Sequence, residues 1–374
     1  MNVKILHLSD LHLGKRVFEY SMLEEQRAVL SQALDMAKRA DVTVIAGDVY
    51  DRPVPPAEAV TLFSAFLTDM NRQKSPVVMI SGNHDSAERV AYLSGLLDAN
   101  GVYVSPVYDG NVRRVTFEDE FGAVNLYLLP FVKPSHVRAA LEDDAIEGYT
   151  AAMRAAIAQM DVDEHARNVL VAHQFVTGAA TSDSEEVSVG GLDGIDASVF
   201  APFDYVALGH LHRAQSLADG RVWYSGSPVC YSFSECGQEK CALLVELGQK
   251  GAVRVERLPF TPVHRMAKRR GTFDELYQME NACADYVQVT LTDEDDVPDA
   301  AAKLAQIYPN LMQVLYDNAR TNARQADFSG LSVQRREPLE LFDEFYAKQN
   351  GAGLSDEQRA LLRAVMEPIW EDER

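Results

Sequence analysis

Short apolar runs alternate with longer amphipathic segments through the first part of the chain, up to about residue 81. Apolar runs of about four to eight residues are typical of buried strands, whereas apolar residues three or four positions apart are typical of helices. An alternating order of strand and helix predicts a parallel sheet that helices cover on both faces. The expected strands are 3–8, 42–46 and 76–81, and the expected helices are 22–38 and 57–70.

From about residue 101 the pattern changes to strand-like segments with fewer helices between them. Two styles of pattern predict two sheets packed face to face with helices outside, a mixed α/β (α+β) architecture. We expect residues 1–265 to form this sandwich as one domain. The later strands are expected at 102–107, 112–117, 123–131, 168–173, 204–209, 221–225, 241–247 and 253–258.

The character of the chain changes again after residue 265, which predicts a separate small unit. The acidic run 293–296 followed by Pro298 is typical of the start of a helix. The expected unit is a βαβ cap within residues 266–320, with a strand at 286–291, a helix to about residue 307 and a strand at 311–316.

The C-terminal part is expected to consist of a linker and a helix pair. Residues 321–337 show no sustained period and are expected to be the linker. Residues 338–374 carry two apolar stripes on either side of a glycine-containing turn, which predicts two amphipathic helices. Ser355 and Gln358 match a capping box at the start of the second helix. The stripes are Leu339, Phe342 and Tyr346, and Leu361, Leu362, Val365, Met366 and Ile369.

The composition is that of an ordinary folded protein. The chain has 374 residues, of which 47% are hydrophobic and 24% are charged. These values exclude disorder, collagen and coiled coil as the main state. No apolar run approaches the roughly 18 residues of a membrane span, and Asp10 interrupts the N-terminal run before a secretory leader could form. We therefore expect a cytoplasmic protein.

The net charge is −21, from 35 basic and 56 acidic residues. This acidity argues against a protein that binds nucleic acid through a basic face. It does not exclude nucleic acid as a substrate, because divalent metal ions supply local positive charge. The four cysteines show no C-x-x-C spacing, so we expect free thiols in a reducing compartment rather than a zinc site.

Metal-binding side chains follow most of the expected strands in the first 215 or so residues. Taken singly, a Gly-Asp pair indicates a turn and a lone histidine indicates a satisfied or surface residue. Carboxyl ends of parallel strands line one crevice, however, so side chains from several strand ends would meet there. The joint pattern predicts a metal site. Its candidate residues are Asp10, His12, Asp48, Asn83, His84, Asp85, His173, His210 and His212.

The types of these side chains also select a chemistry. Aspartate, histidine and asparagine without thiolate suit divalent ions such as Mn²⁺, Fe²⁺ or Zn²⁺. The ligands would fill two sites if one carboxylate bridged them. Two ions about 3.5–4 Å apart generate a hydroxide and hold a phosphoryl group for in-line displacement. A spare histidine could stabilise the transition state or protonate the leaving oxygen.

The motif series D-x-H, G-D, G-N-H-D, H and G-H-x-H resembles that of the calcineurin-like metallophosphoesterases over about the first 260 residues. The stretches ISGNHDSAERV, AGDVYDRPVPP, ALGHLHR, YSGSPVCYSFSE, PLELFDEFY and LSDEQRALL are similar to the SbcD family of bacterial nuclease subunits within that superfamily. The resemblance implies a two-sheet αββα sandwich with a capping domain and a C-terminal helix pair.

The resemblance also implies a role for each motif residue. It implies that His84 and Asp85 are catalytic, with His84 acting on the scissile phosphate and Asp85 orienting it. Asp48 would bridge two ions. The implied ligands of the first ion are Asp10, His12, Asp48 and His212, and those of the second are Asp48, Asn83, His173 and His210.

The implied activity is Mn²⁺-dependent cleavage of DNA, as a 3′-to-5′ exonuclease on duplex ends and an endonuclease on hairpins and single strands. The implied partners are an SbcC-type coiled-coil ATPase, bound through residues 338–374, and a second copy of the chain. Because the chain is acidic, we expect much of the DNA affinity to come from the ATPase. The helices after Pro56 and after Asp85 are the candidate dimer surface, although packing on the sheet explains their apolar residues equally well.

Two alternatives use the same residues. A small-molecule or cyclic-nucleotide phosphodiesterase would have the same dimetal site, but it would not need the cap and the helix pair. A non-catalytic scaffold on this fold would be indicated by loss of Asp48 or His84, and both residues are present.

Overall fold

A computed structural model describes residues 2–185, 193–319, 339, 342–343, 345–347 and 353–362. The linker expected over 321–337 lies outside these residues, as does most of the helix pair expected over 338–374. The described parts of that last segment include helical residues at 342–343, 345–347 and 356–362. No helix in the described part of the chain combines the length and apolarity needed to cross a bilayer.

The first sheet has six strands in the order β14-β13-β1-β4-β5-β6. Its central strands β1, β4 and β5 are parallel, mainly apolar and almost entirely buried, as the alternation of strands and helices predicted. β13 joins antiparallel to β1, so two strands from the later part of the chain complete the sheet begun by the first part. The strands are β1 (Val3–Leu8), β4 (Val42–Ala46), β5 (Val77–Ile80), β6 (Val102–Val104), β13 (Cys241–Leu247) and β14 (Val253–Pro259).

The second sheet also has six strands, in the order β11-β12-β10-β9-β8-β7. Its four inner strands run parallel, and antiparallel strands close both edges. The strands are β7 (Arg113–Asp119), β8 (Gly122–Leu128), β9 (Arg167–His173), β10 (Tyr205–Gly209), β11 (Gln215–Leu217) and β12 (Val222–Tyr224).

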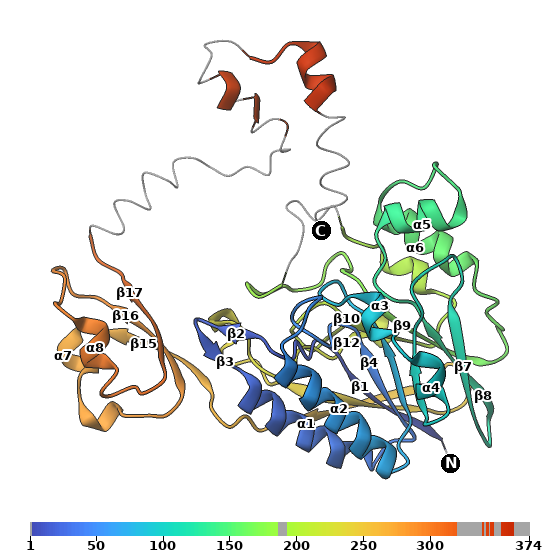
Figure 1. Cartoon of the computed structure of the whole chain (residues 1–374), viewed down its shortest axis with the longest axis horizontal. Helices are drawn as coiled ribbons and strands as arrows, with labels where there is room; N and C mark the ends of the chain where they lie inside the picture. Colours follow the sequence, from blue (N-terminus) through green and yellow to red (C-terminus); the bar gives the residue numbers. More distant parts are fainter. Residues whose placement is uncertain are drawn as a thin grey trace.

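The two sheets pack face to face, and helices cover their outer faces (Figure 1). A core of small and branched apolar side chains from both sheets, among them Ile5, Val44 and Val171, fills the space between them. This arrangement confirms the predicted αββα sandwich. The helices on the first sheet are α1 (Leu23–Ala37) and α2 (Ala57–Arg72), with α3 (Ala87–Val90) and α4 (Ser94–Asp98) at its edge, and those on the second are α5 (Pro134–Leu141) and α6 (Gly148–Ala158).

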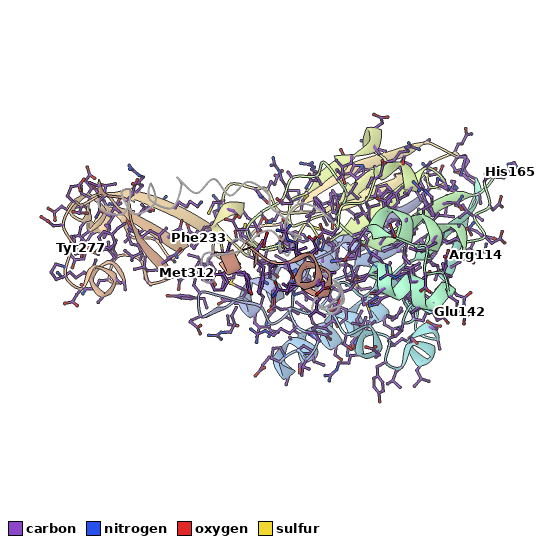
Figure 2. The ribbon with its side chains drawn as sticks, turned by 90° about the horizontal axis from the view of Figure 1, so that it is seen from above. Arg114, Glu142, His165, Phe233, Tyr277 and Met312 are labelled. Atoms are coloured by element: carbon purple, nitrogen blue, oxygen red, sulfur yellow. The ribbon has the colours of Figure 1, made fainter. Side chains whose placement is uncertain are left out.

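A separate three-stranded parallel sheet stands beside the sandwich with its own small core (Figure 1). It contains the expected βαβ unit and one strand that the sequence pattern did not predict, because three of the six residues of that strand are charged. Tyr277 lies at the far end of this unit, whereas Phe233 and Met312 lie at its junction with the sandwich (Figure 2). The elements are β15 (Met266–Gly271), α7 (Phe273–Leu276), β16 (Tyr286–Leu291), α8 (Ala300–Leu304) and β17 (Leu311–Tyr316).

Contacts from α1 and from a small hairpin attach this three-stranded unit to the sandwich. The buried carboxylate of Glu25 accepts hydrogen bonds from the backbone N–H groups of Val263 and His264, at 2.9 and 3.0 Å. The hydroxyl of Tyr20 donates to the carbonyl of Leu311 at 3.1 Å. The remaining short elements are β2 (Arg16–Val17), β3 (Tyr20–Ser21) and the 3₁₀ turns Ala197–Phe200, Ala218–Gly220, Phe233–Glu235 and Met279–Asn281.

Candidate metal centre

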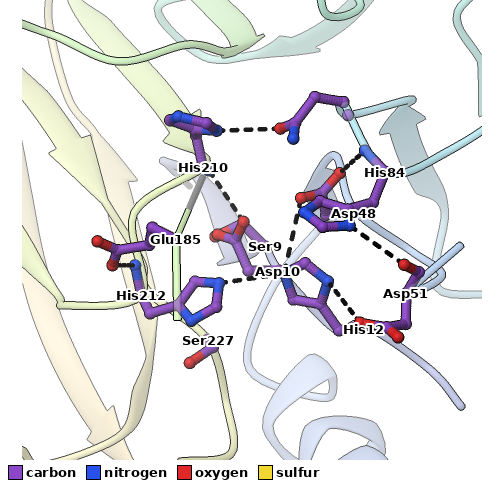
Figure 3. A network of polar contacts seen from close by, with 12 residues as sticks. Ser9, Asp10, His12, Asp48, Asp51, His84, Glu185, His210, His212 and Ser227 are labelled. Atoms are coloured by element: carbon purple, nitrogen blue, oxygen red, sulfur yellow. Dashed lines mark hydrogen bonds and ion pairs between the residues drawn. The ribbon is translucent and has the colours of Figure 1, made fainter. Parts of the chain in front are cut away.

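The predicted metal ligands all lie at the carboxyl ends of central strands of the two sheets. Figure 3 shows five of them, Asp10, His12, Asp48, His210 and His212, gathered in one place. This placement follows from the topology, because parallel strands in both sheets deliver their following loops to one edge. The structure brings the candidates together from five strands. Asp10 and His12 follow β1, Asp48 follows β4, Asn83 follows β5, His173 ends β9, and His210 and His212 follow β10.

The first cluster contains Asp10, His12 and His212, whose ligand atoms lie within 4.8 Å of one another. The Nε2 atoms of His12 and His212 are 3.1 Å apart. Nitrogen ligands bind a divalent ion such as zinc at about 2.1 Å, so two nitrogens at this separation can bind the same ion. All three side chains are almost completely buried.

The second cluster is formed by an amide and two imidazoles. Oδ1 of Asn83 lies 3.0 Å from Nε2 of His173 and 3.0 Å from Nδ1 of His210. Nδ1 of His173 lies 2.8 Å from the backbone carbonyl of Ala46, which fixes the ring and leaves Nε2 toward the amide. Oxygen and imidazole nitrogen together suit a borderline divalent ion.

One carboxylate oxygen lies between the two clusters. Oδ2 of Asp48 is 3.6 Å from Nε2 of His12 and 3.3 Å from Nε2 of His173. The other oxygen, Oδ1, accepts a hydrogen bond from the backbone N–H of His84 at 2.9 Å. The side chain therefore faces both clusters with the same atom, which is the geometry that a bridging ligand requires.

The backbone at this edge is strained. Asp10, His12, Asp48 and His210 all adopt positive φ, at 53°, 43°, 50° and 103°. A non-glycine residue in this region costs about 1–3 kcal/mol and persists only where the surrounding structure enforces it. Strain in four candidate ligands indicates that the fold maintains this arrangement for function rather than for stability.

The glycines beside the ligands leave no room for a side chain. A Cβ at Gly82 would lie 2.1 Å from Oδ1 of Asp48, and a Cβ at Gly47 would lie 2.4 Å from Nδ1 of His173. Gly47 also has φ +85°, which favours glycine. These glycines of the G-D and G-N-H-D motifs therefore permit close approach of the strand ends.

Burial and the charges of neighbouring groups together set the protonation of the site. Burial lowers the pKa of His12 and lowers that of His210 to about 3, so both rings are held in the neutral form that binds metal. Burial opposes ionisation of Asp48, but His173 and its other histidine neighbours hold the pKa of the carboxyl well below its usual range. Burial likewise opposes charge on His173, yet Asp48 raises the pKa of His173 to about 9. A metal ion at Nε2 would replace that proton.

His84 is half-buried beside the first cluster, and its ring lies edge-on to that of His12 at 4.8 Å. Its Nδ1 is 3.1 Å from the backbone carbonyl of Asp51. The Asp85 carboxylate instead accepts three backbone N–H groups at 2.9–3.0 Å, from Gly82, Val49 and Tyr50. Asp85 therefore ties the two ligand-bearing loops together, and the His84 ring contacts the Asp51 carbonyl rather than Asp85.

The structure adds residues that the sequence analysis missed. Asp51 lies within 4.8 Å of ligand atoms of His12 and His84, but Nζ of Lys15 already binds its Oδ1 at 2.6 Å. Asp51 could have been noticed, because it follows the G-D motif by three residues. Glu235 reaches Nδ1 of His212 at 3.3 Å from a distant segment, and no local pattern could have indicated that contact.

Comparison with known proteins agrees with this geometry. The sequence model of the calcineurin-like phosphoesterase family matches residues 3–214. The chain is 30% identical over 383 residues to the SbcD subunit of the SbcCD nuclease of Staphylococcus epidermidis, covering 99% of this chain and all of that protein. The chain belongs to the SbcD family of calcineurin-like phosphoesterases. SbcD-family membership makes it a metal-dependent phosphodiesterase with a divalent metal site.

Two further similarities complete the comparison. A family model described as the type 5 capsule protein repressor C-terminal domain, which is the C-terminal domain of the SbcD family, matches residues 259–350. This match includes the whole three-stranded unit. A solved structure, TT1561 of Thermus thermophilus, is 12% identical with a TM-score of 0.38, covering 69% of this chain and 99% of that one. The family assignment rests on the sequence matches.

Proposed function

We propose that the chain is the nuclease subunit of an SbcC–SbcD-type complex and hydrolyses DNA with two divalent ions, Mn²⁺ by preference. Its proposed actions are 3′-to-5′ exonuclease on duplex ends and endonuclease on hairpins and single strands. One observation carries the proposal: Oδ2 of Asp48 lies between two buried ligand clusters at 3.6 and 3.3 Å. Full-length similarity to the SbcD subunit of an SbcCD nuclease supports the substrate.

The residues present fit a dimetal centre, because their donor atoms are oxygens and imidazole nitrogens at spacings that allow shared ions. When bound, two divalent ions would activate water and neutralise phosphate charge. The buried side chains exclude bulk water, and burial keeps His12 and His210 in the neutral form that metal binding needs. The proposed ligands are Asp10, His12, Asp48 and His212 for one ion, and Asp48, Asn83, His173 and His210 for the other.

His84 is the proposed catalytic residue. Its Nδ1 is engaged by the carbonyl of Asp51, so Nε2 is the nitrogen available to the substrate. In its doubly protonated form the ring would donate the Nε2 proton to a phosphate or leaving oxygen as charge develops, and it would be left neutral with its Nδ1 proton hydrogen-bonded to the Asp51 carbonyl. Asp85 is a positioning residue in this proposal, because its three backbone hydrogen bonds hold the loops that carry Asp48 and His84.

The acidity of the chain supports a partner that supplies DNA affinity. A net charge of −21 opposes binding to a polyanion outside the metal site. We assign this task to an SbcC-type coiled-coil ATPase that binds residues 338–374, in a complex that works on cytoplasmic, nucleoid-associated DNA. Deleting 338–374 should abolish co-purification with the ATPase and leave cleavage of a small phosphodiester intact. Retained complex formation would place the partner surface elsewhere.

A second copy of the chain is the proposed partner at the edge of the first sheet. The turn between α3 and α4 exposes Tyr92 and Leu93 at 70% and 50%, and α4 exposes Leu96 at 67%. Tyr92 lines a surface pocket together with Val60 of α2, which is 43% exposed. Large exposed apolar side chains in one area indicate an interaction surface. Leu96→Glu should convert a dimer into a monomer in sedimentation. An unchanged sedimentation coefficient would show that these side chains do not form the interface.

The test of the nuclease proposal is cleavage by metal-stripped protein with Mn²⁺ or Mg²⁺ added back. End-labelled duplex, hairpin DNA and a chromogenic phosphodiester are the substrates, with His84→Ala as the control. Mn²⁺-dependent DNA cleavage that His84→Ala loses, with metal binding retained, is the expected result. Cleavage of the small ester alone, even with the ATPase present, would favour the small-molecule phosphodiesterase. Near-normal cleavage by the variant would refute the role of His84.

A further inference from the structure

A buried ion pair lies directly behind one of the proposed metal ligands. The side chain of Glu235 is fully buried and that of Lys240 is 8% exposed, and their charged atoms are 2.5 Å apart. Burying two charges is expensive, and a buried pair is often no more stabilising than apolar residues of similar size. A contribution to the stability of the fold therefore does not by itself explain why these two charges are buried here.

Both partners of the pair contact His212. Oε1 of Glu235 is 3.3 Å from Nδ1 of His212, and Ser184 lies against both groups, with its hydroxyl 2.8 Å from that nitrogen. Nζ of Lys240 donates to the backbone carbonyl of His212 at 2.8 Å and to the hydroxyl of Ser227 at 3.0 Å. The pair thus holds one residue by its ring and by its backbone.

These contacts decide which nitrogen of His212 can bind a metal ion. A proton on Nδ1 is donated toward the carboxylate and the Ser184 hydroxyl, so the lone pair is on Nε2. Nε2 is the atom that lies 3.1 Å from Nε2 of His12 in the first cluster. A carboxylate behind a ligating histidine also increases the basicity of the ring and fixes its orientation.

We propose that Glu235 is a positioning residue for His212, holding the ring with Nε2 toward the first metal ion, and that Lys240 balances its buried charge. The inference rests on the proposed dimetal centre and deepens it. The segment that contains Glu235 and Lys240 carries none of the predicted metal ligands. The inference gives this segment a role in orienting a ligand of the metal site.

A second buried ion pair supplies a matched control. Arg167 and Asp119 are 3% and 7% exposed and 2.5 Å apart, so their burial is comparable with that of the first pair. Arg167 also donates to the carbonyls of Leu247 and Gly248 at 3.1 Å. Asp119 binds the backbone N–H of Val3 at the opposite end of β1 from the metal ligands. Breaking this pair tests the effect of lost stability alone.

The experiment is calorimetric titration of metal-free protein with Mn²⁺, together with the visible absorption spectrum of the Co²⁺-loaded form. Glu235→Gln should weaken one of the two sites by about 10–100-fold, leave the other unchanged and alter the Co²⁺ spectrum. Asp119→Asn should lower the melting temperature without changing either site. The double variant Glu235→Gln/Lys240→Met, which removes both charges, should recover melting temperature while the weakened site stays weak.

Two results would overturn the inference. One is a folded Glu235→Gln protein whose two Mn²⁺ affinities both lie within twofold of the parent. The other is recovery of metal affinity in the double variant, which would show that only an uncompensated charge mattered. The readout is metal binding, so it is independent of DNA cleavage. Failure of the parent protein itself to bind two ions would instead refute the dimetal centre of the proposed function.

Discussion

Replacing Gly209 with alanine adds one methyl group at the end of β10, opposite the end of β4 in the other sheet. The added Cβ would lie 2.0 Å from the carbonyl oxygen of Ala46, 2.6 Å from Nδ1 of His173 and 3.0 Å from Cβ of Ser9. The φ angle of Gly209 is outside the left-handed region, so an alanine is acceptable to the backbone itself. The perturbation is therefore purely steric.

The size of the effect follows from these distances. Carbon makes favourable contacts at about 3.5 Å, so relief of the clash requires β10 and β4 to separate by about 1 Å or more. That movement breaks the 2.8 Å contact between Nδ1 of His173 and the carbonyl of Ala46. Overpacking of this kind lowers the free energy of unfolding by about 1–3 kcal/mol. Loss of the contact behind a ligating histidine should weaken Mn²⁺ binding by about 10–100-fold.

The assay combines urea unfolding with Mn²⁺ titration of the Gly209→Ala protein. Gly95→Ala is the matched control, because a Cβ at Gly95 in α4 meets nothing within 4 Å. That control should keep full metal affinity and gain about 0.5–1 kcal/mol of stability, since alanine favours helix over glycine. If Gly209→Ala matches the parent in both stability and metal affinity, the argument from close approach is wrong.

Two further variants remove the negative charges of Asp48 and Asp119. Asp48→Asn should lower the metal content below two ions per chain, because the oxygen between the two clusters loses its charge. Full retention of both ions, measured by elemental analysis, would contradict the bridging role of Asp48. Asp119→Asn should lower the free energy of unfolding at pH 7 by about 3 kcal/mol, because it leaves Arg167 buried without its partner. Hydrogen bonding to Arg167 lowers the pKa of Asp119 to about 2, so the pair stabilises the fold above the ordinary aspartate range. The difference from the parent in urea unfolding should therefore shrink as pH falls from about 4 toward 2, and a difference that stays constant would count against the pair.

Much of the architecture could be predicted from local pattern. The strands β1, β4 and β13 have the bounds that the sequence predicted, because short, mainly apolar runs of this length are typical of buried strands. The α5 and α6 helices were missed, although their apolar residues pack on the second sheet. The sheet membership of β13 and β14 was also missed, because periodicity shows that a segment is a strand but not which strand it pairs with.

For the candidate metal site, too, some features could be predicted from the sequence and others could not. The sequence by itself determined which side chains are available at strand ends, since residue type and the end of an apolar run are both local properties. Only the tertiary structure decided that Oδ2 of Asp48 faces two clusters, that Asp85 binds backbone rather than His84, and that Glu235 lies behind His212. These contacts join residues that are apart in sequence, and they depend on how two sheets, packed through a shared apolar core, bring their strand ends to one edge.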